Sequence, residues 1–254
     1  MKKYTLKNNK TKTLGVVLLL MFWYLIYYFV GNSIIIPSPI ETVIEIKSIV
    51  LGEKFLFIIG STFARTIIAF IMAVALAGIL GILSAVSNVI YNFLIPILKL
   101  LKTMPTMAMV ILALIWLKND KAPILMAILA IFPIIYEGIL NNILNVDKKI
   151  IDMLNLYNVR TIDIIKKIYI PKTISGIKQI FSSTLGLCFK IIIGGEILAS
   201  PNNSIGSEIQ LQKIYLNTAG VFAWIFIIIV LSMILELIIF YFQKMLIYKL
   251  KNRN

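Results

Sequence analysis

The chain has 254 residues, of which 60% are hydrophobic and only 14% are charged, and it carries a formal net charge of +14. A water-soluble domain could not cover its surface with so few charges, so the composition predicts a protein that crosses the membrane several times. The chain has no histidine and one cysteine, which excludes Ser–His proteases, most His-metal sites and an intrachain disulfide, and we expect no metal site.

Six apolar segments are long enough to cross a bilayer as helices, which predicts an all-α fold. The first follows a basic tail, but no small-x-small cleavage site comes after it, so we expect a retained anchor and not a signal peptide. We expect the third to bend near Pro105. The segments are Leu14–Val30, Thr62–Val86, Phe93–Leu117, Ala122–Ile143, Ile174–Ala199 and Ala219–Phe242.

The distribution of lysine and arginine predicts the orientation of these helices. Basic residues are concentrated in four segments that alternate with the apolar ones, and such residues collect on the cytoplasmic side. Both termini are therefore expected in the cytoplasm of a multi-pass protein of the cell membrane. We expect a cytoplasmic tail over residues 1–13 and a transmembrane domain over 14–254, with its core over 60–242 and a cytoplasmic loop over 145–172.

Two segments on the predicted outer side are longer than simple turns. After Pro37 and Pro39, residues 41–51 (ETVIEIKSIVL) have the pattern of an amphipathic helix that lies at the membrane interface. Residues 205–216 (IGSEIQLQKIYL) predict a second short amphipathic helix. Each segment is either a plain connector or a docking surface for an external partner.

The cytoplasmic loop shows a helical pattern twice, with a break between. Asn158 lies at the break, and asparagine tolerates the left-handed conformation that ends helices. We expect a second helix that Pro171 closes, so the loop is a folded helix–turn–helix segment. It is basic and amphipathic, which favours binding to a soluble partner. The apolar faces are Ile150, Ile151, Leu154 and Tyr157 in the first helix and Ile162, Ile165, Ile168 and Tyr169 in the second.

This loop resembles that of the permease subunits of ATP-binding-cassette importers. Their pattern is EAA, three residues, Gly, nine residues and Ile-x-Leu-Pro, and here Asp152-Met153-Leu154, Asn158 and Ile168-Tyr169-Ile170-Pro171 take these places. Met153 and Leu154 are bulkier than the alanines of the family. The resemblance implies that this is the coupling helix that binds an ATPase subunit. The implied coupling residues are Asp152, Met153, Leu154, Asn158, Val159 and Pro171.

The resemblance extends from about residue 60 to 240 and is strongest to the nitrate, sulfonate and taurine branch of these permeases. It implies the type I importer permease fold, with six transmembrane helices. The residues that carry it are Arg65, Pro96, Pro105, Ala108, Trp116, Pro133, Lys190, the triplet Gly194-Gly195-Glu196, the pair Ile205-Gly206 and the triplet Phe222-Ala223-Trp224.

Four residues are candidates for the translocation pathway: Pro105, Lys190, Gly195 and Glu196. A charge at mid-bilayer costs about 2.5–3.5 kcal/mol and usually faces a partner or a wet cavity. Lys190 either lines the passage and attracts an anionic solute or extends to the cytoplasmic interface. Glu196 is either a gate residue beside closely packed glycines or a partner at the outer end of its helix.

The sequence also predicts the surroundings of these intramembrane residues. Lys190 and Glu196 lie about 240° apart on a helix, so we do not expect them to pair. We expect the side chain of Arg65 to reach lipid headgroups at the outer surface. Pro105 either borders the passage or is a packing kink.

The chain has no GxxxxGK[ST] loop, so we expect no enzymatic activity and no cofactor of its own, with ATP bound by a partner subunit. The resemblance implies a permease homodimer in membrane lipid, ATP-binding-cassette ATPase subunits and an extracytoplasmic solute-binding protein. The solute implied is small and anionic or heteroaromatic, such as a sulfonate, nitrate, taurine or a thiamine precursor. No nucleic-acid partner is expected.

Two alternatives remain. A transmembrane scaffold of a vitamin importer also offers coupling helices, but it would carry Ala-Arg-Gly signatures that we do not find in the sequence. A non-transporting membrane enzyme or assembly factor would need clustered polar catalytic residues at one interface. The lack of histidine and the few carboxylates argue against that class.

Overall fold

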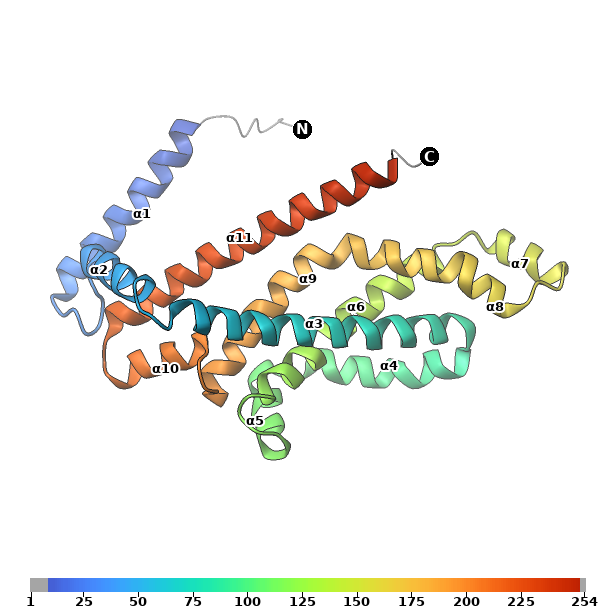
Figure 1. Cartoon of the computed structure of the whole chain (residues 1–254), viewed down its shortest axis with the longest axis horizontal. Coiled ribbons are helices and arrows are strands. Elements are labelled where there is room, and N and C mark those ends of the chain that lie inside the picture. Colours follow the sequence, from blue (N-terminus) through green and yellow to red (C-terminus); the bar gives the residue numbers. More distant parts are fainter. Residues whose placement is uncertain (1–8, 252–254) are drawn as a thin grey trace. The chain divides into compact units, whose positions relative to one another are not determined.

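A computed structural model describes residues 9–251, and within that range every regular element is a helix. The described chain forms two compact units, shown by their helices in Figure 1. The first unit combines the residues up to Leu56 with Glu208–Ile229, and the second combines Phe57–Ser207 with the residues from Val230 onward. Each is described by itself below.

Aromatic stacking holds the first unit together. The ring of Trp23, on α1 (Asn9–Val30), stacks on Phe222 and Phe226 of α11 (Thr218–Lys251), with ring centroids 5.7 and 5.5 Å apart. Its indole Nε1–H donates to the carbonyl oxygen of Pro37 at 3.1 Å, so the ring is both packed and hydrogen-bonded. These contacts fix the first helix against the beginning of the last one.

Both short helices predicted on the outer side are present. α2 (Pro39–Val50) begins with a capping box, in which the Ser38 hydroxyl accepts from the Glu41 N–H and the Glu41 carboxylate accepts from the Ser38 N–H. α10 (Ile205–Ile214) is the second. The predictions of helices over 41–51 and 205–216 are therefore confirmed, with bounds shifted by up to two residues.

Three helices form the centre of the second unit: α3 (Phe55–Val86), α6 (Ala122–Leu144) and α9 (Ile170–Ala199). Glycines allow their close approach. A Cβ at Gly138 of α6 would lie 2.8 Å from Ile180 Cδ1 of α9, and one at Gly81 of α3 would lie 3.0 Å from Ile139 Cγ2 of α6. The core includes Ala69, Phe70, Ala73, Ile131, Ile135, Tyr136, Leu185, Cys188 and Ile192.

The third predicted span is not one bent helix. It consists of α4 (Asn88–Thr103) and α5 (Thr106–Trp116), which meet at an angle of 105°. Pro105 forces the residue before it out of the helical region, and Met104 is extended with ψ 130°. The 11 residues of α5 measure about 16 Å, roughly half the thickness of the hydrocarbon core. The predicted bend near Pro105 is therefore a break between two helices, which Figure 1 shows.

Five helices in the described residues are long and apolar enough to cross a membrane, and the broken α4–α5 pair makes a sixth if it counts as one span. The expectation of six spans is confirmed in that sense. α6 agrees with its predicted segment to within one residue, while α1 begins five residues before the predicted Leu14 and α3 begins seven residues before the predicted Thr62. α11 begins one residue before its predicted segment and ends nine residues after the predicted Phe242.

The prediction that Pro171 closes a separate helix is wrong. α7 (Lys148–Leu156) is followed by α8 (Thr161–Ile164), a π-helical turn η1 (Ile165–Tyr169) and then α9 without interruption. Pro171 lies in the first turn of α9. The wider π turn, in which the Ile170 N–H donates to the Ile165 carbonyl, accommodates the missing N–H and the ring of the proline.

Candidate functional site

The turn after α7 has a fixed geometry. Asn158 adopts the left-handed conformation with φ 51°, as the sequence predicts. The Val159 N–H donates to the Leu154 carbonyl oxygen at 3.0 Å, and the Tyr157 N–H donates to that of Met153 at 3.1 Å. The left-handed Asn158 and the Val159–Leu154 hydrogen bond, which spans five residues, are those of a Schellman motif, in which the helix end satisfies its own carbonyl groups. The segment is therefore an ordered helix end and not a flexible linker.

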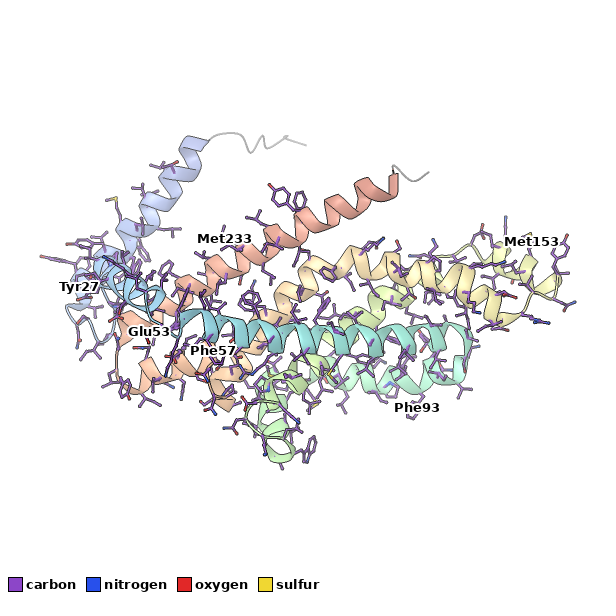
Figure 2. The ribbon with its side chains drawn as sticks, in the orientation of Figure 1. Tyr27, Glu53, Phe57, Phe93, Met153 and Met233 are labelled. Carbon is purple, nitrogen blue, oxygen red and sulfur yellow. The ribbon has the colours of Figure 1, made fainter. Side chains whose placement is uncertain are left out.

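Apolar side chains are exposed on this segment. Met153 is 49% exposed, Leu156 82% and Tyr157 78%. Figure 2 labels Met153 on α7, and α7 and α8 lie at the same end of the second unit. Large apolar side chains that are exposed together on a polar loop are typical of a surface that binds a protein or a membrane. We call Met153, Leu156 and Tyr157 the α7 surface.

The other predicted coupling residues lie around this surface. Asp152 and Asn158 are exposed, while Leu154 and Val159 are half-buried and so contribute to the packing of the turn. Pro171 is exposed on α9, beyond η1, and belongs to the junction that joins the loop to the span. The structure thus brings five of the six residues together at α7 and its turn.

At the other end of α9 a group of charged and polar residues connects several segments. The Arg65 guanidinium donates to Glu196 Oε1 through Nη1 and to Asp120 Oδ1 through Nη2, each at 3.0 Å. Its Nη2 also donates to the Asn202 carbonyl oxygen at 3.0 Å. The Thr62 hydroxyl donates to Glu196 Oε2 at 3.0 Å. We call Thr62, Arg65, Asp120 and Glu196 the Arg65 cluster.

The backbone after α9 completes the cluster. The Gly206 N–H donates to Glu196 Oε2 at 3.3 Å, and the Ile205 N–H donates to the Thr62 hydroxyl at 3.1 Å. Glu196 is fully buried, Arg65 is 12% exposed and Asp120 is 58% exposed. Breaking a buried pair by removing one partner typically costs about 3–5 kcal/mol. An exposed pair contributes only about 0–1 kcal/mol.

The expectation that Arg65 reaches lipid headgroups is therefore wrong. Its charge is neutralised within the protein because two carboxylates and a carbonyl oxygen lie within hydrogen-bonding distance, and such pairing is the usual solution for a charge inside a membrane span. Of the two interpretations of Glu196, the structure shows the ion pair near the end of its helix.

The comparison with known proteins agrees with the loop geometry. The family model described as the binding-protein-dependent transport system inner membrane component matches residues 77–248, which include α7, its turn and α9. The chain belongs to this family. It is therefore a multi-pass inner-membrane permease of an ABC importer, and ATP is hydrolysed by a separate subunit.

Two relatives of this chain are also named as transport permeases. The putative aliphatic sulfonates transport permease protein SsuC of Bacillus subtilis (strain 168) is 23% identical over 205 residues, which cover 80% of this chain and 74% of that protein. A probable ABC transporter permease protein of Brucella melitensis biotype 1 is 20% identical over 215 residues, covering 84% and 86%. These similarities extend over most of each protein, at low identity.

The predicted pathway residues are not all together in the permease. Lys190 is exposed about two thirds of the way along α9, and Pro105 is exposed at the α4–α5 break. Gly195 is buried, and a Cβ there would lie 2.8 Å from Met126 Cε of α6, so the close helix approach expected at this glycine is confirmed. Gly195 and Glu196 therefore lie at packed positions.

Sequence reasoning missed two members of the Arg65 cluster, Thr62 and Asp120. The one available signal was that an arginine inside a span needs an acidic partner. Asp120 and Glu196 are 55 and 131 residues away from Arg65, and no local pattern connects them.

Proposed function

We propose that this permease forms the translocation pathway for a small anionic or heteroaromatic solute that an external binding protein delivers. We propose further that the α7 surface binds the ATPase subunit. The observation that carries the second proposal is the α7 surface itself, with three exposed apolar side chains on a helix end that a left-handed Asn158 fixes. Such a surface offers both apolar area and a defined shape to a partner.

Force on this loop would reach the other end of α9 through one continuous element. α8, η1 and α9 together form a helical segment of 39 residues, Thr161–Ala199. At 1.5 Å per residue it is about 58 Å long. Its far end carries Glu196 and therefore the Arg65 cluster. Movement of the loop by the ATPase would tilt α9 as a lever and switch the pathway between inward-open and outward-open states.

The proposed orientation has both termini in the cytoplasm, which agrees with the positive-inside rule. α2, α10 and the α5–α6 turn then lie on the outer side, where the binding protein docks. Two copies of the permease related by a twofold axis would line one passage, and each would present one α7 surface to one ATPase subunit.

The solute class has two supports. The Bacillus subtilis relative is named for aliphatic sulfonates, which are anions. Lys190 supplies an exposed cation on α9, in the last third of a helical segment that is long and apolar enough to span the membrane. A lysine in a water-filled passage would attract an anionic headgroup, whereas a lysine that extends to the interface would have no effect on selectivity.

Uptake by proteoliposomes that contain the permease, its ATPase and its binding protein tests the solute class. The solutes are taurine, an aliphatic sulfonate, nitrate and a thiamine precursor. We expect uptake of one anion, and we expect Lys190→Gln to lower it about tenfold, while Lys190→Arg keeps the charge and most of the rate. Equal uptake by the parent and Lys190→Gln would contradict a role for Lys190 in the passage. Uptake of none of the four would contradict the proposed solute class.

A further inference from the structure

A polar stripe runs along α9, which belongs to the least apolar of the five long candidate spans in the described residues. Its members are three or four residues apart, so at about 100° per residue they fall within about 80° of the helix circumference. All of them except the glycine are exposed. Ionisable and polar groups inside a span usually face a partner or a water-filled cavity and not lipid. We call the following residues the α9 stripe: Lys172, Ser175, Gln179, Ser183, Gly186 and Lys190.

Lys190 is too far from both ends of α9 for its amine to reach them. It lies nine residues before Ala199 and twenty after Ile170, which is about 14 and about 30 Å along the axis, longer than an extended lysine side chain. Side chains on a helix lean toward its N-terminus, so Lys190 leans away from the nearer end and over Gly186, one turn before it. Among the described residues it makes no ion pair or hydrogen bond.

Glu236 of α11 supplies a carboxylate over the same turn of α9. It belongs to the second unit, as α9 does, and lies within the apolar segment Thr218–Tyr241. Its Oε1 lies 3.6 Å from the position that a Cβ would take at Gly186, so the carboxylate lies on the α9 stripe. Glu236 is exposed and, within the described part of the chain, makes no ion pair or hydrogen bond. The hydroxyl of Ser232, one turn before it, is buried and has no hydrogen-bond partner there either.

The two charges favour a solute that carries both signs. Glu236 would repel a simple anion over about the same distance at which Lys190 attracts it, so the two effects would largely cancel. A solute with an ammonium group and an anionic group would donate to Glu236 and accept from Lys190 at once, which compensates both intramembrane charges. Without a solute, the Lys190 side chain can turn to Glu236 and neutralise it.

We propose that Lys190 and Glu236 together form a site on the α9 stripe for a small zwitterionic solute. The proposal rests on the passage stated under the proposed function. It narrows the solute class to molecules that carry an ammonium group beside the anionic one. The α9 stripe is then the wall of α9 that faces the passage, and Ser232 supplies a hydroxyl one turn from the carboxylate.

Charged thiol reagents test whether both residues face one aqueous space. The full-length permease in lipid nanodiscs carries Cys188→Ala and one new cysteine, either at Ser183 on the α9 stripe or at Ile174, which is exposed on the other side of α9. The rates of a cationic and an anionic methanethiosulfonate reagent are measured at low salt. The parent is compared with Glu236→Gln, Glu236→Asp and Lys190→Gln.

A unit charge about 6 Å away in water changes the local concentration of a monovalent ion about threefold. We therefore expect the ratio of the cationic to the anionic rate at Ser183→Cys to fall about three- to tenfold in Glu236→Gln and to rise as much in Lys190→Gln. Glu236→Asp should keep the ratio of the parent, and no variant should change the ratio at Ile174→Cys. An unchanged ratio at Ser183→Cys in either charge-removing variant overturns the proposal, so the test holds even if the other variant fails to fold.

Protection by two sulfonates of the same length tests the solute class with the same cysteine. Taurine carries an ammonium group where isethionate carries a hydroxyl. Taurine should slow the modification of Ser183→Cys more than isethionate does in the parent, and this difference should be lost in Glu236→Gln. Equal protection by the two compounds in the parent, or a difference that Glu236→Gln keeps, overturns the zwitterion site.

Both measurements use the permease without its ATPase or binding protein. Their failure is therefore distinguishable from a failure of the proposed function, which would appear as a loss of ATPase binding or as no uptake of any of the four solutes.

Discussion

Gly206 lies where the first turn of α10 meets the backbone of α9. A Cβ there would approach Ile197 N to 2.5 Å and Glu196 Cβ to 2.4 Å, distances that real Cβ atoms do not reach. We predict that Gly206→Ala destabilises the permease by about 1–3 kcal/mol because the backbone must shift. Gly194→Ala is the matched control, since nothing lies within 4 Å of its Cβ position. Thermal unfolding of both variants in detergent checks the prediction, and equal midpoints would contradict it.

Glu208 on α10 predicts a pH dependence of stability. Burial raises the pKa of its carboxyl above the ordinary value, and the charge of Lys54 lowers it by a smaller amount. The folded state therefore favours the protonated form, and the free energy of unfolding falls as the pH rises from the ordinary glutamate pKa of about 4.3 through the raised value. The variant Glu208→Gln has no carboxyl at this position, so its free energy of unfolding should not fall in this way.

The variant Glu208→Gln should therefore unfold at a higher temperature than the parent near neutral pH, and the difference should shrink as the pH falls below the ordinary glutamate value. Lys54→Gln should have the opposite effect, because it removes the opposing charge. Unfolding midpoints across a pH series measure both. A difference between Glu208→Gln and the parent that does not depend on pH would exclude titration of this carboxyl as its cause.

At the scale of single residues, sequence reasoning was accurate where the constraint was local. The left-handed Asn158 follows from the helical pattern on both sides of it, and the close approach at Gly195 follows from its size. The partners of Arg65 were not predictable in the same way. Asp120 and Glu196 meet it through the packing of three distant segments, and one sequence contains no signal for such a meeting.

The α7–α8 turn is the element in which a backbone change should alter function most selectively. Asn158 has φ 51°, which glycine adopts freely and a β-branched residue does not. We predict that Asn158→Val weakens ATPase binding about tenfold, the factor that corresponds to a left-handed penalty of about 1–2 kcal/mol. Asn158→Gly should bind nearly as the parent does. Titration of the purified ATPase on permease in nanodiscs measures both affinities, and similar losses in the two variants would show that the side chain matters and the backbone does not.

Helices were predictable where a long apolar segment specifies a membrane span, and less predictable near prolines. The segments around α6 and α11 carry strong apolar runs. The predicted bounds of α6 and the predicted start of α11 agree with the observed ones to within one residue, while α11 continues nine residues beyond the predicted Phe242. Proline allows several outcomes in a membrane helix. Pro133 is accommodated inside α6, Pro105 breaks a span by 105°, and Pro171 follows a π turn in a continuous helix. Packing against neighbouring helices determines which outcome occurs, so the sequence around each proline does not predict it.

For the whole molecule, family membership and the described geometry support one account. In the proposed account a separate ATPase binds the α7 surface and a continuous helical segment of 39 residues would transmit its movement; the structure shows that the Arg65 cluster lies at the other end of that segment. Composition alone predicted the membrane class, and the spacing around Asn158 suggested the family to which the chain belongs. Composition and spacing do not identify the solute, because neither determines which side chains line the passage.

The most direct test of the account is binding of the ATPase to the α7 surface. The permease is purified from its native membrane, its partners are identified by mass spectrometry, and the affinity of the identified ATPase is measured for the parent, Met153→Glu and Lys190→Gln. We predict that an ATP-binding-cassette ATPase co-purifies with the parent and with Lys190→Gln, and that Met153→Glu lowers its affinity at least about tenfold because a charge enters an apolar contact. An ATPase that binds Met153→Glu as tightly as the parent would contradict the central claim.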